Sequence, residues 1–235
     1  MEDLDPRYVV LILGAVLAFF LWLLLRIHTA DKRRARALEA IAPLMGFTYQ
    51  PKDSSLLETF ERYRIFRSGS NPWVTNVLSG RIEHAEARVL DYSYHSGGKR
   101  GGYDVYTVAL LRTHGLDLPY FAVNRAVPGF DRAGSFLEAK GLLGHPDGAP
   151  VEFPSDPAFS KHFVVRGRPG AVSALLDEEV RRHLMRFVEE LVGLEGHRDT
   201  FLFTRWQTVA PDCVRAFLEE AAAVHRLLAR RAPAR

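Results

Sequence analysis

Cysteine is almost absent from this chain of 235 residues, in which Cys213 is the single one. With one cysteine the chain forms no internal disulfide, so a hydrophobic core must hold its domain together. We expect Cys213 to be buried, because it borders the apolar face of the last predicted helix. Lysine is also scarce, with 5 lysines against 26 arginines, which suggests a GC-rich bacterial genome.

An excess of charge is missing outside the first 36 residues. The chain has 31 basic and 28 acidic residues, and residues 1–36 hold six basic and four acidic ones, which leaves 25 and 24 for the rest. A surface that binds nucleic acid needs a concentration of Lys and Arg to neutralise phosphates. The composition therefore predicts no nucleic-acid partner.

Patterns that would assign a reaction are missing too. Ser96 and Lys99 match the spacing of some acyl-transfer nucleophiles, but they fall in a glycine-rich turn rather than at the start of a helix. The acidic and histidine residues between Glu83 and His95 should alternate between the two faces of a strand, which separates potential metal ligands. We therefore assign no catalytic residue, no metal ligand and no cofactor, and leave open an enzyme with a dispersed site.

What the sequence does contain is an uncharged run of 18 residues from Tyr8 to Leu25. At about 1.5 Å per residue, a helix of this length spans about 27 Å, close to the thickness of bilayer hydrocarbon. The acidic residues that precede it and the lack of a small-x-small cleavage site argue against a signal peptide. We expect a transmembrane helix over residues 8–27, which would contact the lipid bilayer, after a short extracytoplasmic N-terminus of residues 1–7.

Basic residues follow the apolar run and predict the orientation of the chain. They are Arg26, Lys32, Arg33, Arg34 and Arg36. The positive-inside rule then places the N-terminus outside and the main domain in the cytoplasm, at the cell (inner) membrane. Residues 28–46 are expected to form a basic juxtamembrane helix, whose cations either bind anionic lipid headgroups or only set the topology.

For the remaining residues, 47–235, the sequence predicts a soluble α+β domain with a mainly antiparallel sheet packed by helices. Four successive strands are expected, over residues 73–82, 87–94, 103–112 and 120–124. Their links are too short for helical crossovers, which predicts an antiparallel meander. A hairpin over residues 191–205 and an amphipathic helix from Pro211 should complete the domain. Residues 129–150, rich in glycine and proline, are a candidate boundary between two halves.

One loop of the predicted meander has an unusual composition. Residues 96–102 hold four glycines and two adjacent cations between tyrosine-rich strands. Glycines let a backbone approach a partner closely, and the cations would favour acidic groups. We hypothesise that His95, Lys99, Arg100 and Tyr103 form an interaction site; the alternative is a plain hairpin tip.

Several segments carry a resemblance to a known family. They are NVLSGRI, VLDYSY, YTVALLR, GLDLPYFAV, FPSDPAFS and PDCVRAFLEEA, within residues 38–228. The chain resembles a family of uncharacterised bacterial proteins with a single membrane anchor. The resemblance implies a bacterial origin and one N-terminal anchor, and it implies no activity, cofactor or catalytic residue.

Two functions fit these features. The first is a membrane-tethered, non-catalytic interaction or scaffold domain that binds an unidentified protein partner. The alternative is a module that binds a lipid or small ligand at the membrane surface, in a pocket between the sheet and its helices.

Overall fold

An antiparallel sheet of nine strands forms the centre of the domain, in the order β1-β2-β3-β4-β9-β8-β5-β7-β6. The strands are β1 (Thr48–Lys52), β2 (Ser70–Ile82), β3 (Ala85–His95), β4 (Tyr103–Arg112), β5 (Leu118–Arg125), β6 (Pro150–Val151), β7 (Phe163–Gly167), β8 (Val192–Arg198) and β9 (Thr200–Arg205). Every neighbouring pair is antiparallel. This computed structural model describes residues 6–67, 70–95, 102–126, 148, 150–190 and 192–232, without the side chains of 6–12, 20, 21 and 23–28.

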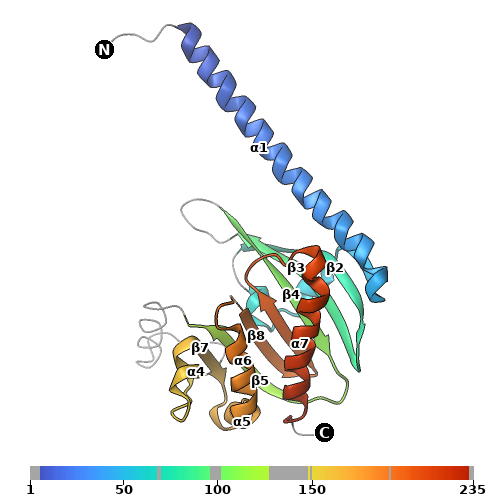
Figure 1. The fold of residues 1–235 in the computed structure, drawn as a ribbon, viewed down its shortest axis with the longest axis vertical. Helices are drawn as coiled ribbons and strands as arrows, with labels where there is room; N and C mark the ends of the chain where they lie inside the picture. Colours follow the sequence, from blue (N-terminus) through green and yellow to red (C-terminus); the bar gives the residue numbers. More distant parts are fainter. Residues whose placement is uncertain are drawn as a thin grey trace, which may run out of the picture.

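Helices cover both faces of the sheet, which confirms the predicted α+β class (Figure 1). The helices are α1 (Pro6–Ile41), α2 (Ser55–Thr59), α4 (Pro157–His162), α5 (Pro169–Leu175), α6 (Glu178–Leu184) and α7 (Val214–Ala229), with 3-10 turns η1 (Pro43–Met45), η2 (Arg64–Arg67), η3 (Met185–Phe187) and η4 (Pro211–Cys213). Helices α5, α6 and α7 and the end of α1 pack on one face, while α2 and η2 pack on the other.

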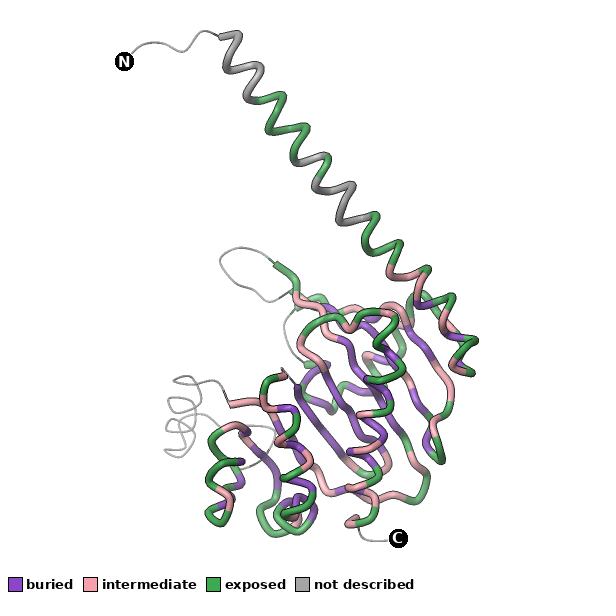
Figure 2. Tube along the Cα trace, viewed as in Figure 1, coloured by how far each residue is buried: buried purple, intermediate pink, exposed green. Residues whose placement is uncertain are grey.

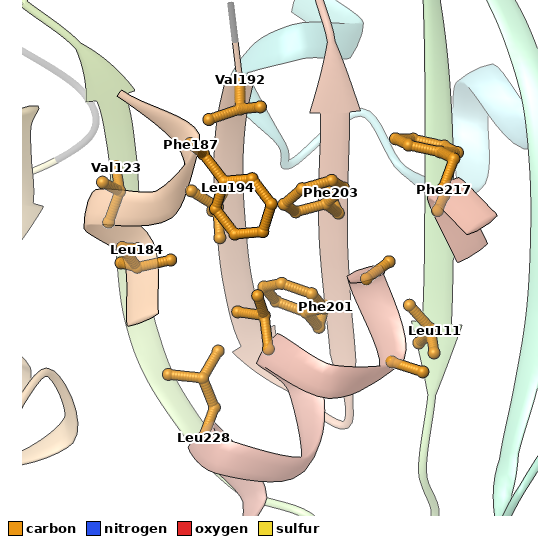
Figure 3. Close-up of a cluster of buried hydrophobic side chains, with 14 of the residues drawn as sticks. Leu111, Val123, Leu184, Phe187, Val192, Leu194, Phe201, Phe203, Phe217 and Leu228 are labelled. Carbon is orange, nitrogen blue, oxygen red and sulfur yellow. The ribbon is translucent and has the colours of Figure 1, made fainter. Parts of the chain in front are cut away.

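The alternation of side chains along each strand builds two cores. In β4, Ala109 and Leu111 face the α7 side, whereas Val108 and Leu110 face α2 and η2. On the α7 side, the ring of Phe203 lies 5.5 Å from that of Phe217 and 5.4 Å from that of Phe187, measured between ring centroids (Figure 3). Burial of one large apolar side chain stabilises the folded state by roughly 1.5–3 kcal/mol, so these two cores hold the helices against the sheet.

The predicted meander is correct for three strands and wrong for the fourth. β5 pairs with β7 and β8, and the C-terminal hairpin of β8 and β9 lies between β4 and β5. A short link permits neighbouring strands to pair but does not require it, because a distant hairpin with matching apolar faces can occupy the same edge. The strands before and after residues 129–150 therefore join one sheet; residues 127–147 lie outside the described residues.

Helix α1 is continuous from Pro6 to Ile41, so no break separates the apolar run from the predicted juxtamembrane helix. The linking segment has neither Gly nor Pro, which leaves nothing to interrupt the helix. The helix ends at Ile41, short of the predicted residue 46, because Pro43 lacks the N–H that a helix interior requires, and Gly46 adopts a φ of 74° after the following turn. Among the described residues, no helix combines the length and apolar character needed to span a bilayer.

Only the C-terminal end of α1 packs on the domain, and the rest projects away from it (Figures 1 and 2). Leu38 and Ala42 are buried in the core. One turn earlier, Arg34 donates hydrogen bonds from Nε and Nη2 to the two carboxylate oxygens of Asp91 in β3, both at 2.8 Å. Its Nη1 donates to the carbonyl oxygen of Val209 at 2.5 Å. Arg34 thus fixes α1 to the sheet.

Cys213 is exposed, contrary to the expectation from sequence. The last helix starts with the 3-10 turn η4, and its buried face begins only at Val214. Cys213 is the N-cap residue of α7, so it precedes the helical face that packs on the sheet.

Candidate functional site

Two neighbouring cavities lie beside the β8–β9 hairpin. Cavity A has a volume of about 450 Å³ and lies between the β8–β9 hairpin and the α2–η2 segment; its walls include Thr59, Phe60, Arg62, Tyr63, Arg112, His114, Leu116, Asp199 and Thr200. Cavity B, of about 1000 Å³, lies between the same hairpin and α5; its walls include Asp117, Leu118, Pro119, Tyr120, Arg168, Pro169, Ala171, Ala174, Leu175 and Arg231. His197 and Arg198 line both cavities.

The β8–β9 hairpin carries Arg198 between the two cavities in a strained backbone conformation. His197 pairs with Thr200, which leaves Arg198 and Asp199 as a two-residue turn. The φ of Arg198 is 56°, a region where Gly, Asn or Asp is usual because a Cβ atom crowds the backbone. Non-glycine residues in such conformations cost about 1 kcal/mol or more and are found preferentially at functional sites.

Positive charge dominates cavity A. Arg112 is paired, because its Nε donates to Oδ2 of Asp199 at 2.7 Å. In the described part of the chain, the side chains of Arg62 and Arg198 form no hydrogen bond or ion pair. Burial raises the pKa of Asp199, but hydrogen bonds from Arg112 and Thr200 outweigh it and lower the pKa overall. Asp199 is therefore ionised at neutral pH and offsets one of the three guanidinium groups.

The titration of the neighbouring rings reflects this environment. Burial lowers the pKa of His197, and the cations Arg198 and Arg62 lower it further. Burial also raises the pKa of Tyr63 to about 12. Both side chains are therefore neutral at physiological pH. His197 can accept a proton more readily when an anion is present, because an anion stabilises the imidazolium form.

A buried carboxylate holds the wall of cavity A in place. Glu195 in β8 is buried, and its oxygens accept hydrogen bonds from the backbone N–H groups of Arg64 at 2.7 Å and Ile65 at 3.2 Å. Next to it, the hydroxyl of Tyr63 donates to the carbonyl oxygen of His197 at 3.3 Å. These contacts tie the α2–η2 segment to β8, so the wall and the hairpin form one unit.

Cavity B combines an apolar wall with cations. Its apolar side chains come from the start of β5 and from α5, and they include Leu118, Ala171 and Leu175. The charge of Arg231 is neutralised by Asp177, at 2.6 Å, and by Glu179. Within the described residues Arg168 has no recorded ion pair. Among the described residues, the two cavities together offer three guanidinium groups without an ion pair, and one acid, Asp117, beside an apolar surface.

This arrangement suits binding rather than reaction. Guanidinium groups recognise phosphate and carboxylate through paired N–H donors, and the apolar wall would remove a hydrocarbon chain from water. Within the described part of the chain, no group of three or more His, Cys, Asp or Glu side chains lies close enough to hold a metal ion. The potential ligands near Glu83 and Asp91 are separated, since Glu83 pairs with Arg226 and Asp91 with Arg34.

The interaction site hypothesised from sequence lies at the opposite end of the sheet. His95 and Tyr103 face each other across β3 and β4, and both rings contact Trp73 in β2, with centroids 5.6 and 5.7 Å away. Trp73 is an addition to the residues expected from sequence. Lys99 and Arg100 lie outside the described residues.

The five juxtamembrane cations separate into two groups. Arg34 is turned onto the domain by Asp91 and is not available to headgroups while that contact persists. Lys32, Arg33 and Arg36 are exposed on α1. The side chain of Arg26 lies outside the described residues.

Sequence reasoning missed the paired cavities because their residues come from four distant segments. One local feature lies in the hairpin predicted over residues 191–205: the structure places Arg198 and Asp199 in its two-residue turn, where Asn-Gly or Asp-Gly is favoured. A bulky cation in that place indicates a requirement other than turn formation.

Comparison with known proteins supports the fold alone. No family model matches this chain, and no curated protein matches its sequence. The crystal structure of the mycobacterial trehalose monomycolate transport factor A, TtfA, is similar, with a TM-score of 0.57 and 16% sequence identity over 86% of this chain and 97% of that one.

Proposed function

We propose that this chain is a membrane-tethered module that binds an amphiphile with an anionic headgroup in cavities A and B. The observation that carries the proposal is the pair of cavities that share Arg198: Arg62 lines cavity A, and Arg168 lines cavity B beside the apolar wall of α5. Among the described residues, none of these three guanidinium groups has an ion pair. An anionic headgroup would satisfy the cations, and an acyl chain would cover the wall.

The volumes are adequate for such a ligand. Ligand sites usually occupy about 300–1,000 Å³ and combine an apolar lining with a few polar groups that fix orientation. Cavities of about 450 and 1000 Å³ that share Arg198 meet this requirement. The strained backbone of Arg198 is consistent with a functional demand on that side chain.

The structural likeness supports the same reading. The similar crystal structure is that of a transport factor for trehalose monomycolate, a lipid. The likeness covers 97% of that protein and 86% of this chain. At 16% identity it does not identify the ligand of this chain.

The tether in this proposal is the apolar run of residues 8–27. Several of its side chains lie outside the described residues, and the proposal rests mainly on its sequence. It is supported by large exposed apolar side chains on the projecting part of α1, including Leu17 at 71% and Trp22 at 52% exposure. We further propose that the N-terminus lies outside and the domain in the cytoplasm, so a C-terminal alkaline phosphatase fusion should be inactive.

A scaffold for a protein partner, the first function expected from sequence, stays a prediction. It shares the tether with the present proposal but requires no cavity. Substitutions inside cavity B therefore distinguish the two functions.

The test is native mass spectrometry of the protein extracted from membranes in mild detergent. The unmodified chain should carry a bound lipid of defined mass. Ala174→Trp places a large ring in cavity B and should abolish that adduct, because Ala174 lies on the cavity wall. Ser173→Trp is the matched control: Ser173 is exposed on the same helix and does not line the cavity.

Retention of the lipid by the Ala174→Trp variant would contradict the proposed site. Absence of any lipid in the unmodified protein, together with specific capture of one protein partner, would favour the scaffold function instead.

A further inference from the structure

Three aromatic rings gather at the end of the sheet opposite cavities A and B. Trp73, His95 and Tyr103 come from three neighbouring strands, and the ring of Trp73 contacts the other two. Tyr103 is 49% exposed, and His95 is exposed as well. We call these three residues the aromatic end. Trp and Tyr rings with one apolar and one polar side are the residue types that concentrate at membrane–water interfaces.

The aromatic end lies on the face of the sheet that carries α1. Asp91 and His95 are four positions apart in β3, so their side chains point to the same face of the sheet. Asp91 is the residue that pairs with Arg34 of α1. Tyr103 and Thr107 of β4 are directly opposite His95 and Asp91, which places them on that face too.

Helix α1 runs toward the aromatic end. Ala42 accepts a hydrogen bond from the N–H of Phe47, whose ring covers Gly80, and Gly80 pairs with Ala87 of β3. Ala42 therefore lies near the level of Ala87, and Arg34 lies at the level of Asp91. From Ala42 to Arg34 the helix rises about 12 Å, and from Ala87 to Asp91 the strand rises about 13 Å. The two elements are close to parallel, as Figure 1 shows.

The same rises place the end of the apolar run at the level of the aromatic end. The helix rises about 14 Å over the nine positions from Arg34 to Leu25, and the strand rises about 13 Å over the four positions from Asp91 to His95. If the apolar run from Tyr8 to Leu25 occupies the hydrocarbon, the headgroup region of the adjoining leaflet lies at the height of His95.

A hollow between α1 and the domain fits this placement. It has a volume of about 830 Å³ and is lined by Trp22, Thr29, Ala30, Arg33, Arg34, Ala37 and Pro211. Trp22 is its large apolar side chain, and Arg33 is an exposed cation in its lining. Headgroups of an anionic lipid would fill a space with this lining.

From these relations we infer that the aromatic end is a second membrane contact, inserted in the headgroup region of the bilayer that holds α1. The inference rests on the proposed tether but not on the amphiphile site. Two contacts, one helix and one sheet end, fix the orientation of the domain. β4 then runs along the membrane normal. Its length of about 30 Å separates the membrane surface from Arg112, which lines cavity A.

Depth-dependent fluorescence quenching in vesicles tests this contact on the full chain. The chain has three tryptophans, Trp22, Trp73 and Trp206. The variant Trp22→Phe with Trp206→Phe leaves Trp73 as the only reporter. It is reconstituted in vesicles of phosphatidylcholine and phosphatidylglycerol, with or without phosphatidylcholine brominated near the top of its acyl chains.

The emission of Trp73 should shift to shorter wavelength and lose intensity in the brominated vesicles. A positive control keeps only Trp22, which should also be quenched. A negative control replaces all three tryptophans with Phe and adds His84→Trp, since His84 is exposed in the β2–β3 turn, at the other end of β3, and lines neither cavity; it should not be quenched.

The outcomes separate this inference from the tether. If vesicles carry the protein upward in a density gradient while Trp73 remains as little quenched as the His84→Trp variant, the second contact is absent and the tether stands. If the protein does not float with the vesicles, both the tether and the second contact are overturned.

Discussion

Replacement of Arg34 by methionine should destabilise the domain by about 3 kcal/mol. The side chain of Asp91 is only 4% exposed, and Arg34, 16% exposed, is its charge partner. Removal of one member of a buried ion pair typically costs about 3–5 kcal/mol, because the other charge stays buried. Asp91 keeps two neutral donors, Nδ2 of Asn76 at 2.8 Å and Oγ1 of Thr107 at 3.0 Å, which places the cost at the lower end.

The backbone explains why Asp91 has these partners. A bulge in β2 between Thr75 and Leu78 sets Asn76 at a φ of 54° and turns its amide toward the carboxylate. Tyr49 donates its hydroxyl to Oδ1 of Asn76 at 2.9 Å and orients that amide. These hydrogen bonds therefore satisfy one buried carboxylate, and Arg34 provides the opposite charge.

Urea denaturation of a chain that begins at residue 28 measures the effect, since this chain keeps Arg34 and lacks the apolar run. With a slope of about 3 kcal/mol per molar urea, a loss of 3 kcal/mol lowers the midpoint by about 1 M. Arg33→Met is the matched control, because Arg33 is exposed on the same turn, and its effect should stay within about 0.5 kcal/mol. Equal midpoints for the Arg34→Met and Arg33→Met variants would refute the reasoning.

Three further effects should be measurable in the same chain. Burial lowers the pKa of His225, so this side chain stays neutral in the folded state while it gains a proton in the unfolded state near a pKa of about 6.5. The free energy of unfolding should therefore fall as the pH drops below that value, by at most about 1.4 kcal/mol per pH unit. The His225→Gln variant should show a flatter profile of melting temperature against pH. A Cβ atom on Gly196 would stand 2.3 Å from the Phe121 ring, so Gly196→Ala should cost about 1–3 kcal/mol in urea, whereas Gly170→Ala, with nothing within 4 Å, should not destabilise. Arg198→Asn should relieve the strain of the positive φ and leave the free energy of unfolding equal or higher by up to about 1 kcal/mol. The same substitution should weaken the binding of an anionic amphiphile in a titration without vesicles. Lower stability with unchanged binding would contradict the role of Arg198.

Local patterns predicted much of the fold. The strand over residues 103–112 has the predicted bounds, because its alternating apolar side chains face two cores. The helix beginning near Pro211 and the C-terminal hairpin are present as predicted, since caps, turns and apolar stripes are set by neighbouring residues.

Long-range pairings could not be predicted from the same patterns. Nothing near β5 in the sequence indicates that β8 and β9 enter between it and β4. The partner of Arg34 is 57 residues away in the chain, so a cation that reads as one of five membrane-facing charges is in fact a structural contact. Cavities A and B depend on both kinds of long-range contact, and their cations carry no motif.

Photolabelling with a lipid tests the central claim, that the chain binds an amphiphile between the β8–β9 hairpin and α5. Cells that express the full chain are supplied with a fatty acid bearing a diazirine near its terminal methyl group, irradiated, and the labelled peptides are identified by mass spectrometry. A tethered helix would be labelled within residues 8–27 in any case, which serves as an internal control. The amphiphile site predicts a second labelled peptide that contains residues 169–175, lost in the Ala174→Trp variant and kept in the Ser173→Trp variant. Label confined to residues 8–27 in the unmodified chain would contradict the claim.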